Sequence, residues 1–163
     1  SAGILFICEG EALLAHSTNS PMFGSWMPPK GGVDPDESIL GAAIRETEEE
    51  IGIKVDASLL DGSFDIFYTD KRGKCYKIVT IFPVEVVSKN LEDNWGIKRV
   101  GGLQMEEIDQ VEWMGSDEVK KRALYRYTDI IINQLKKSPV LLIAQHSMIG
   151  SVISAMSRLA KTF

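Results

Sequence analysis

The sequence predicts a single α/β domain, in which β-strands and helices share one chain. Short runs of β-branched and aromatic residues, bounded by glycine and polar residues, recur between residues 3 and 114 and are typical of strands. Residues 34–51 and 116–136 instead carry apolar residues at the spacing of an amphipathic helix. The chain has 163 residues, which suits one domain with one hydrophobic core.

Composition excludes several classes of protein. The net charge of −5 argues against a coat for a nucleic-acid polymer, although it allows a local basic pocket. Cys8 and Cys75 lie far apart and neither belongs to a CxxC motif, so we expect no disulfide scaffold and no zinc site. The first residues lack the charged region of a signal peptide. We therefore expect a cytoplasmic protein that binds no membrane.

The first elements are predicted to be a hairpin and a loop. Residues 3–8 and 12–16 are apolar and flank a polar Glu9-Gly10-Glu11 turn, which predicts two buried strands. Residues 17–30 are rich in serine, proline and glycine and are predicted to form a loop. The loop leads into a proline-glycine turn over residues 28–32, where proline restricts φ and glycine permits positive φ.

A helix is predicted to follow, capped at its start by Asp34 or Asp36 and ended by Gly52. At 100° per residue, an apolar stripe would face the core and three glutamates would share an adjacent edge. The stripe comprises Leu40, Ala43, Ile44, Thr47 and Ile51, and the glutamates are Glu46, Glu49 and Glu50.

The second half is predicted to contain three more strands and a helix. The strands span residues 59–69, 75–87 and 108–114, and Pro83 indicates a sheet edge or a bulge within the second. A long loop over 88–107 separates the second strand from the third, and loops of this length are often functional. One helix capped by Ser116 is predicted over 116–136.

We divide the chain at residue 138. Residues 1–138 form the predicted domain, and 139–163 form an amphipathic helical extension packed on or near it. Serines interrupt this extension, which argues against a membrane span. It either covers the core or offers a surface to a partner, for which a second copy of the chain, giving a homodimer, is one candidate.

Residues 45–50 have an unusual density of charge, since five of the six are charged and four of those are carboxylates. Like charges one helical turn apart destabilise a helix, so a nearby cation would account for the run. Hard carboxylate oxygens suit Mg²⁺ or Mn²⁺, and Mg²⁺ held by few carboxylates often grips substrate phosphates. The alternative interpretation is a solvated acidic helix face.

The spacing Gly31-x5-Glu37-x7-Arg45-Glu46-Thr47-x-Glu49-Glu50-x-Gly52-Ile53 resembles the 23-residue signature of the Nudix hydrolases. Thr47 departs mildly from it, since a bulky aliphatic residue is commoner there. The resemblance implies an α/β/α sandwich with a mixed β-sheet. It also implies Mg²⁺- or Mn²⁺-dependent hydrolysis of a pyrophosphate bond in a nucleoside diphosphate linked to another moiety.

The same resemblance implies roles for individual residues. Glu46, Glu49 and Glu50 match the metal-ligand carboxylates, with Glu50 the tightest ligand, and the carbonyl of Lys30 matches a backbone ligand. Arg45 matches the arginine that orients a glutamate. Glu37 and Gly31 match supporting positions. A further glutamate, as base or ligand, often comes from a later loop, and here the candidates are Glu107 and, less well placed, Glu106, although a plain loop remains an alternative.

The substrate is less defined. The approach to the signature resembles the diadenosine tetraphosphate hydrolase branch and the related diphosphoinositol polyphosphate phosphohydrolases. The candidate substrate-binding residues are Lys30, Lys71, Arg72, Lys74 and Tyr76, although a solvated hairpin tip and a packing tyrosine remain alternatives.

Three functions stay open. The first is a dinucleoside polyphosphate hydrolase, acting for example on diadenosine tetraphosphate. The second is a hydrolase of nucleoside triphosphates, oxidised ones included, or of diphosphoinositol polyphosphates. The third is a catalytically inactive module that senses a nucleotide or binds a partner.

Overall fold

A computed structural model describes residues 1–19 and 24–137. The extension over 139–163 lies outside the described residues, so its helix and its roles stay predictions. In chain order the elements are β1 (Ala2–Cys8), β2 (Glu11–Ser17), β3 (Trp26–Met27), β4 (Lys30–Gly31), α1 (Ile39–Ile51), β5 (Ile53–Val55), the 3₁₀ turn η1 (Ala57–Leu59), β6 (Phe64–Thr69), β7 (Cys75–Glu85), the 3₁₀ turn η2 (Leu91–Asp93), β8 (Ile97–Arg99), β9 (Ile108–Met114), α2 (Ser116–Arg122) and α3 (Tyr125–Lys136).

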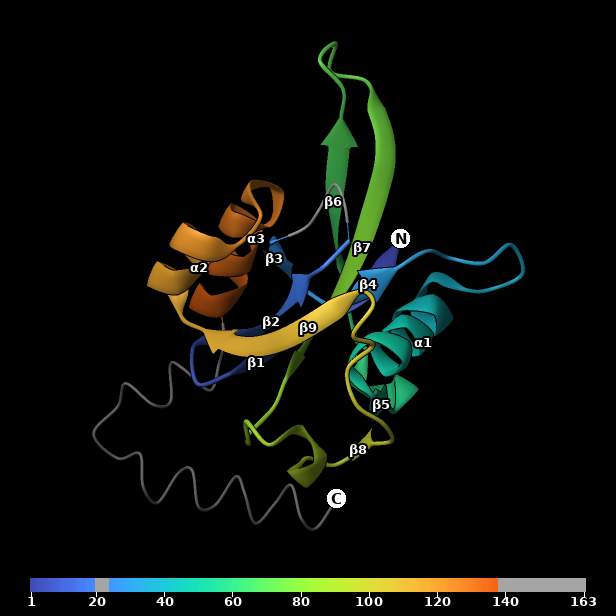
Figure 1. Ribbon diagram of the computed structural model, residues 1–163, viewed down its shortest axis with the longest axis vertical. Helices are drawn as coiled ribbons and strands as arrows, with labels where there is room; N and C mark the ends of the chain where they lie inside the picture. Colours follow the sequence, from blue (N-terminus) through green and yellow to red (C-terminus); the bar gives the residue numbers. More distant parts are fainter. Residues whose placement is uncertain (20–23, 138–163) are drawn as a thin grey trace.

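The main sheet is mixed. Its order is β3-β2-β1-β7-β6, with β4 also paired to β1 and β9 also paired to β2. β1 runs parallel to β7, whereas its pairing with β2 and that of β6 with β7 are antiparallel. β5 and β8 form a separate two-stranded sheet. Figure 1 shows β6 and β7 extending well beyond the body of the domain.

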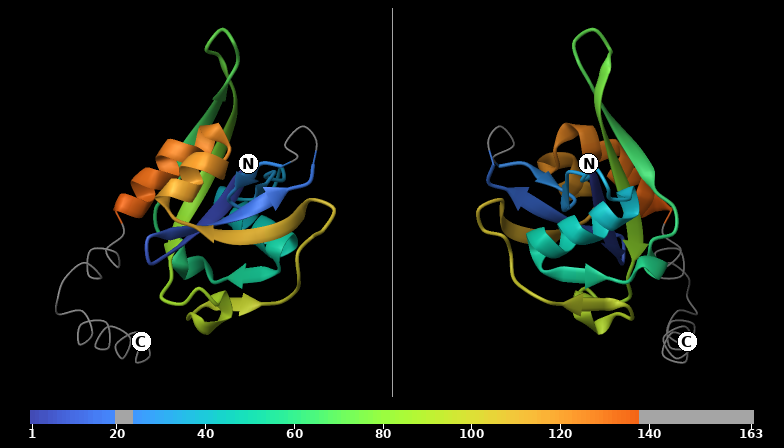
Figure 2. Two further views of the ribbon diagram at one scale, coloured as in Figure 1. Left: turned by 60° about the vertical axis from the view of Figure 1, so that its left-hand side comes forward. Right: turned by 90° about the vertical axis from the view of Figure 1, so that its right-hand side faces the viewer.

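Helices cover both faces of this sheet, as the Nudix resemblance implies. Alternate residues of β1 divide between two apolar clusters, because successive side chains of a strand point to opposite faces. Ile4 and Phe6 pack in the cluster that contains α1, while Leu5 and Ile7 pack in the cluster that contains α3. Figures 1 and 2 show α1 on one side of the sheet and α2 and α3 on the other. The α/β/α sandwich is therefore confirmed.

The start of α1 differs from the prediction and its end agrees. Ser38 is the N-cap, because its hydroxyl accepts a hydrogen bond from the Gly41 N–H at 2.9 Å. Asp34 instead begins a turn in which its carbonyl accepts from the Glu37 N–H, so neither Asp34 nor Asp36 caps the helix. Gly52 ends the helix with φ of 70°, a left-handed conformation that glycine adopts without strain.

The apolar stripe of α1 faces the core as expected. Ala43, Thr47 and Ile51 are buried, and Leu40 and Ile44 pack against the same cluster. The hydroxyl of Thr47 donates to the Ala43 carbonyl at 2.8 Å. Thr47 can therefore occupy a position where an aliphatic residue is commoner without an unsatisfied buried polar group.

The N-terminal hairpin is confirmed, but the predicted loop over 17–30 contains two short strands. β3 pairs with β2, and β4 pairs with β1 at Gly3. Gly3 makes this possible, since a Cβ there would overlap the Pro29 carbonyl oxygen. Two-residue strands carry no periodicity, so the pattern of polar residues alone gave no sign of them.

Residues 53–107 contain further short elements. β6 starts at Phe64 rather than at residue 59, and the predicted loop over 88–107 contains η2 and β8. β8 pairs with β5, a strand of three residues that the sequence pattern did not reveal.

Pro83 occupies a local edge, as predicted. The N–H of Thr80 donates to the Ser1 carbonyl, and the N–H of Val86, directly after β7, donates to the Ile7 carbonyl. The N–H groups of the odd-numbered residues of β7 therefore point toward its other neighbour, β6. The pairing of β6 ends at Phe64 opposite Ile81, and Pro83 lies beyond it. Pro83 still pairs with Leu5 of β1, but β6 offers no ladder partner opposite it, so the missing N–H of proline costs no hydrogen bond.

The helix predicted over 116–136 is two helices, α2 and α3. Ala123 pairs with Trp26, and the Leu124 N–H donates to the Trp26 carbonyl at 2.9 Å. These contacts interrupt the helical hydrogen bonds at a position where the local pattern favours continuation. Gly115, not Ser116, is the N-cap of α2. Among the described helices, none is long and apolar enough to span a membrane.

Candidate active site

The three candidate glutamates of α1 differ in exposure. Glu50 is buried, the side chain of Glu46 is 14% exposed and that of Glu49 is 51% exposed. They lie along the edge of α1, next to the turn that contains Lys30 and Gly31. The helix thus presents carboxylates in a series from the protein interior to solvent.

Arg45 neutralises the outer part of this group. Its guanidinium binds Glu37 through two hydrogen bonds, from Nε at 2.7 Å and from Nη2 at 2.8 Å. Nη1 also donates to Glu46 at 2.9 Å and to Glu49 at 3.2 Å, and Nη2 donates to the Gly32 carbonyl at 2.8 Å. These bonds raise the pKa of Arg45 and lower that of Glu37, because they stabilise the charged form of each group.

The turn before α1 contacts two of the glutamates. The Lys30 N–H donates to Oε1 of Glu50 at 2.8 Å. A Cβ on Gly31 would overlap the carboxylate of Glu46, so glycine is required for this close approach. Pairing of β4 with β1 holds the turn in place.

Burial dominates the electrostatics of the inner part. It raises the pKa of Glu50 to about 7, with added repulsion from Glu46 and Glu107, although the Lys30 N–H acts in the opposite direction. Burial also raises the pKa of Glu46. It lowers the pKa of the Lys30 ammonium group, and the charge of Lys77 lowers it further. A cation bound beside Glu50 would favour the ionised carboxylates.

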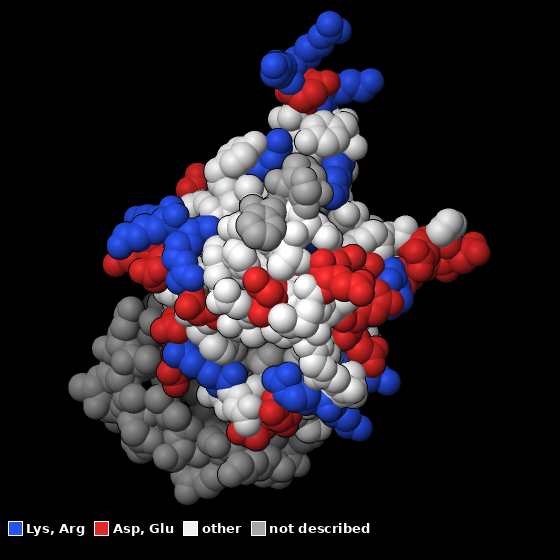
Figure 3. Space-filling view, in the orientation of Figure 1, with Lys and Arg blue, Asp and Glu red and all other residues white. Residues whose placement is uncertain are grey.

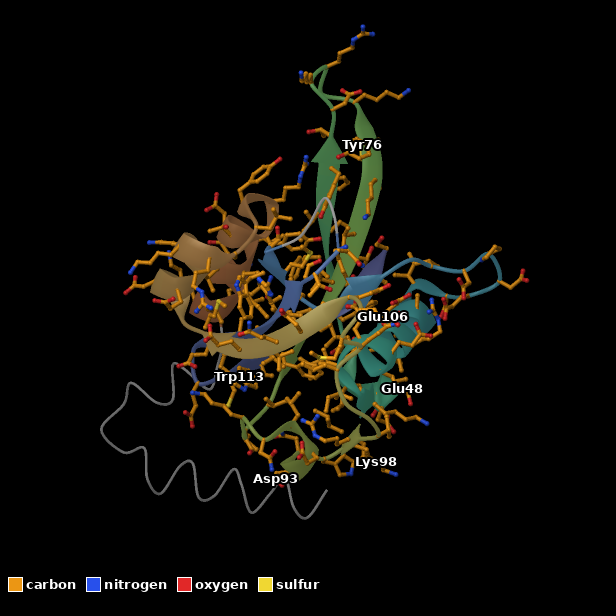
Figure 4. All side chains as sticks on the ribbon, viewed as in Figure 1. Glu48, Tyr76, Asp93, Lys98, Glu106 and Trp113 are labelled. Atoms are coloured by element: carbon orange, nitrogen blue, oxygen red, sulfur yellow. The ribbon has the colours of Figure 1, made fainter. Side chains whose placement is uncertain are left out.

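Glu107 joins this group from the loop before β9. A cleft of about 160 Å³ is lined by both Glu50 and Glu107, together with Lys30, Ser17, Asn19, Met27, Pro28 and Ile108. Glu106 is not among the lining residues, and its carbonyl accepts from the Thr18 hydroxyl at 2.8 Å. Figure 4 shows Glu106 on the loop that leads into β9. Of the two loop candidates, Glu107 is therefore the one beside Glu50.

The donor set fits a hard divalent cation. Glu46, Glu49, Glu50 and Glu107 offer carboxylate oxygens, and no histidine or cysteine lines the described cleft, so Mg²⁺ or Mn²⁺ suits it better than zinc. As the side chains lie, no three of the acidic, histidine or cysteine residues within 1–19 and 24–137 converge on a common point. Glu46 and Glu49 are turned toward Arg45 instead.

The hairpin cations lie apart from the carboxylates. Lys71, Arg72 and Lys74 belong to the tip between β6 and β7, where Asp70 Oδ1 accepts from the N–H groups of Arg72 and Lys74. Figure 3 shows these cations well separated from the acidic surface over α1. The structure therefore does not bring them to the cleft.

Tyr76 does not line the cleft either, and it lies at a β-bulge. Tyr68 pairs with Lys77 and Thr69 pairs with Cys75, so Tyr76 is the extra residue of β7. Bulges redirect side chains, and Tyr76 contacts the edge of Tyr68 with 6.2 Å between ring centroids. Figure 4 shows Tyr76 on the extended part of the β6–β7 hairpin.

Sequence reasoning missed the cations that lie around Tyr68. Lys77 Nζ is 5.1 Å and Arg126 Cζ is 4.4 Å from the Tyr68 ring centroid, and the Tyr68 and Tyr127 hydroxyls are 2.8 Å apart. We call Tyr68, Tyr76, Lys77, Arg126 and Tyr127 the Tyr68 cluster. Neither Lys77 nor Arg126 forms an ion pair with any residue that the structure describes.

The Tyr68 cluster is electrostatically connected to the cleft, since the charge of Lys77 acts on Lys30. Lys77 adjoins Tyr76 in sequence, so a wider search around the cation-rich turn could have found it. Nothing in the sequence pattern indicated Arg126, because its contact with Tyr68 joins two distant segments, α3 and β6.

Comparison with known proteins adds a family context. The family model described as NUDIX domain matches residues 1–145. Diphosphoinositol polyphosphate phosphohydrolase 2 of Mus musculus is 35% identical over 91 residues, which are 56% of this chain and 48% of that protein. The chain thus spans about half the length of the curated relatives it matches.

Solved structures share the fold. A C. elegans Ap4A hydrolase in a binary complex has a TM-score of 0.57 and 25% identity, covering 83% of this chain and 93% of that one. The MutT protein of Methanosarcina mazei Go1 has a TM-score of 0.59 at 20% identity, covering 84% and 94%.

Proposed function

Because this chain belongs to the Nudix family, we propose that it is a pyrophosphohydrolase that uses a divalent metal ion to cleave a phosphoanhydride bond in a nucleoside polyphosphate. The observation that carries the proposal is the convergence of Glu50 and Glu107 on one cleft, with Glu46 and Glu49 beside them on α1. An acidic helix face that was only solvated would not require burial of Glu50 or a glycine against Glu46.

Each residue has a role in this proposal. Glu46, Glu49 and Glu50 would hold Mg²⁺ or Mn²⁺ with the Lys30 carbonyl, and the bound metal would polarise the phosphoryl group. Arg45 keeps Glu37, Glu46 and Glu49 in place through its hydrogen bonds.

Glu107 is the proposed base. Its carboxylate takes a proton from a water molecule as that oxygen attacks phosphorus in line. A new P–O bond forms, the bridging P–O bond opposite breaks, and the leaving phosphate carries the bridging oxygen away. The Lys30 ammonium group, which lines the same cleft, offsets negative charge on the phosphates.

The substrate we favour is a dinucleoside polyphosphate such as diadenosine tetraphosphate. Lys77 and Arg126 can bind phosphate groups without breaking any ion pair that the structure describes. The charge of Lys77 also lowers the pKa of Lys30, which lines the cleft. Tyr76 and Tyr125 are 61% and 72% exposed, so their rings are available for stacking on a base. An inositol ring has no π face, which makes a diphosphoinositol polyphosphate the second candidate despite the 35% identity with a hydrolase of that name.

A substrate panel tests these proposals. Wild-type protein is incubated with Mg²⁺ or Mn²⁺ and diadenosine tetraphosphate, nucleoside triphosphates or a diphosphoinositol polyphosphate, and products are separated by chromatography. We expect ATP and AMP from the first compound. A nucleoside monophosphate with pyrophosphate, formed faster from triphosphates, would favour the nucleotide-pool alternative.

Glu50→Gln should lower kcat about 10³-fold or more, since it removes a proposed metal ligand and keeps the shape of the side chain. Glu48→Gln is the matched control, because Glu48 belongs to the same helix but does not line the cleft. Absence of turnover of every compound by the folded wild-type protein would support an inactive module and overturn the enzymatic proposal.

A further inference from the structure

The pairing of β2 with β9 contains a second bulge, directly after the loop that carries Glu107. His16 pairs with Gln110 and Ser17 pairs with Ile108, so Asp109 is the extra residue of β9. The bulge brings Asp109 Oδ1 to 2.6 Å from His16 Nδ1. The His16 ring is itself held against Trp26, with 4.9 Å between ring centroids. Asp109 of β9 thus contacts the His16 ring of β2, which itself packs against Trp26.

The backbone of Glu107 is fixed on both sides. Its carbonyl accepts from the Thr18 N–H at 2.8 Å, which joins it to the end of β2. Its N–H donates to the Gln104 carbonyl at 2.9 Å, and the Gln104 N–H donates to the Glu50 carbonyl at 2.9 Å. Hydrogen bonds therefore run from the last turn of α1 through Glu107 to β2.

The bulge decides which way Glu107 faces. Without it, regular pairing would continue from His16 and Gln110 to place Asp109 opposite Ser17. A shift of one residue turns every following side chain to the other face of the sheet. Glu107 would then leave the cleft that it shares with Glu50, so whatever holds Asp109 out of the regular ladder also holds Glu107 in place.

We propose that His16 and Asp109 are positioning residues for Glu107, and that their contact holds the β9 bulge in the register that aims the Glu107 carboxylate into the cleft. This inference rests on the proposed function, because it assumes that Glu107 acts in catalysis. Neither residue lines the cleft, so both act through the backbone.

Two variants of the pair test the inference. His16→Phe removes Nδ1 but keeps a ring against Trp26, and Asp109→Asn keeps the size of the side chain but removes its charge. We expect His16→Phe to lower kcat about tenfold while KM changes by less than about twofold, with a smaller effect for Asp109→Asn. Glu11→Gln is the matched control, since it removes an ion pair with Lys89 at the other end of β2, away from the bulge.

A double-mutant cycle separates positioning from general stability. In a Glu107→Gln background, His16→Phe should cause no further loss of kcat, because the group it positions is already absent. Hydrogen exchange of the Thr18 amide, whose acceptor is the Glu107 carbonyl, should be faster in His16→Phe than in Glu11→Gln.

Three outcomes overturn the inference. One is an unchanged kcat in His16→Phe. Another is an equal loss of kcat with and without Glu107, which would indicate a general structural role. The third is a Glu107→Gln variant with wild-type activity while Glu50→Gln is inactive, which leaves the proposed metal-dependent hydrolysis standing but rules out Glu107 as its base. Wild-type activity of Glu50→Gln would instead contradict the proposed function itself.

Discussion

The carboxylate group of α1 and the Tyr68 cluster are built in opposite ways. Glu46, Glu49 and Glu50 come from two turns of one helix, and Arg45 of the same helix neutralises part of their charge. The Tyr68 cluster instead joins side chains of β6, β7 and α3. Local spacing therefore determines the carboxylates proposed to bind the metal, whereas tertiary contacts determine the groups proposed to recognise the substrate.

Both regions depend on an irregular backbone position. Gly31 allows the turn to approach Glu46, and the bulge at Tyr76 directs that ring toward Tyr68. The difference is that the glycine is visible in the sequence, while a bulge exists only relative to the partner strand. Four predictions test whether the two regions behave as this comparison implies.

The largest expected effect concerns the stability of the metal-free protein. Burial raises the pKa of Glu50 from 4.5 to about 7, so the folded state binds an additional proton between these values. The free energy of unfolding should therefore fall as pH rises through that window, by about 3 kcal/mol from this group.

Glu50→Gln removes this penalty. With a chelator present, the variant should exceed wild type in stability to urea by up to about 3 kcal/mol at about pH 8, and by little at about pH 4. Glu48→Gln on the same helix serves as control. A Glu50→Gln variant that is less stable than wild type at the higher pH would contradict the conclusion that burial raises the pKa of Glu50.

The second prediction concerns the turn before α1. Gly31→Ala should lower kcat about 10²-fold with the fold retained, because the new Cβ displaces the flexible carboxylate of Glu46 rather than backbone. Gly32→Ala is the matched control, since no heavy atom lies within 4 Å of a Cβ at that position. Similar activities for the two variants would show that the position of Glu46 is not critical. Circular dichroism checks the fold of both.

The third prediction sharpens the contrast between the Tyr68 cluster and the hairpin tip. Replacing both Lys77 and Arg126 with glutamine should raise KM for diadenosine tetraphosphate about tenfold at low salt, because two phosphate partners are lost. Replacing Lys71 and Arg72 removes the same charge from the tip and should change KM by less than about twofold. The reverse ranking of the two double variants would assign recognition to the tip.

The smallest effect is expected for the buried hydroxyl pair. Tyr127→Phe leaves the Tyr68 hydroxyl without its partner and should cost about 1 kcal/mol of stability in urea denaturation. Tyr125→Phe is the control, since Tyr125 is 72% exposed. Equal stability of the two variants would indicate that the Tyr68 hydroxyl finds another partner.

Much of the fold could be predicted from the sequence. The N-terminal hairpin, α1 with its buried stripe, β7 and β9 agree with the expected elements. Most of the corrections involve a contact with a distant segment, whereas the Ser38 cap of α1 is a local hydrogen bond to the Gly41 N–H. Ser38 rather than an aspartate caps α1, while β3, β4, β5 and β8 exist through pairing, and Trp26 divides the helix expected over 116–136.

Local sequence patterns were enough to predict the α/β class, a helix that ends at Ile51 and the carboxylates and arginine that lie on one edge of it. Residues three or four positions apart lie on the same face of a helix, so the local sequence shows which side chains of a helix are neighbours. The packing of distant segments was needed to show that Glu107 rather than Glu106 lines the cleft with Glu50, that the hairpin cations lie outside it, and that Lys77 and Arg126 meet at Tyr68. Strand register and bulges depend on the partner strand, and a single residue of shift reverses the direction of a side chain.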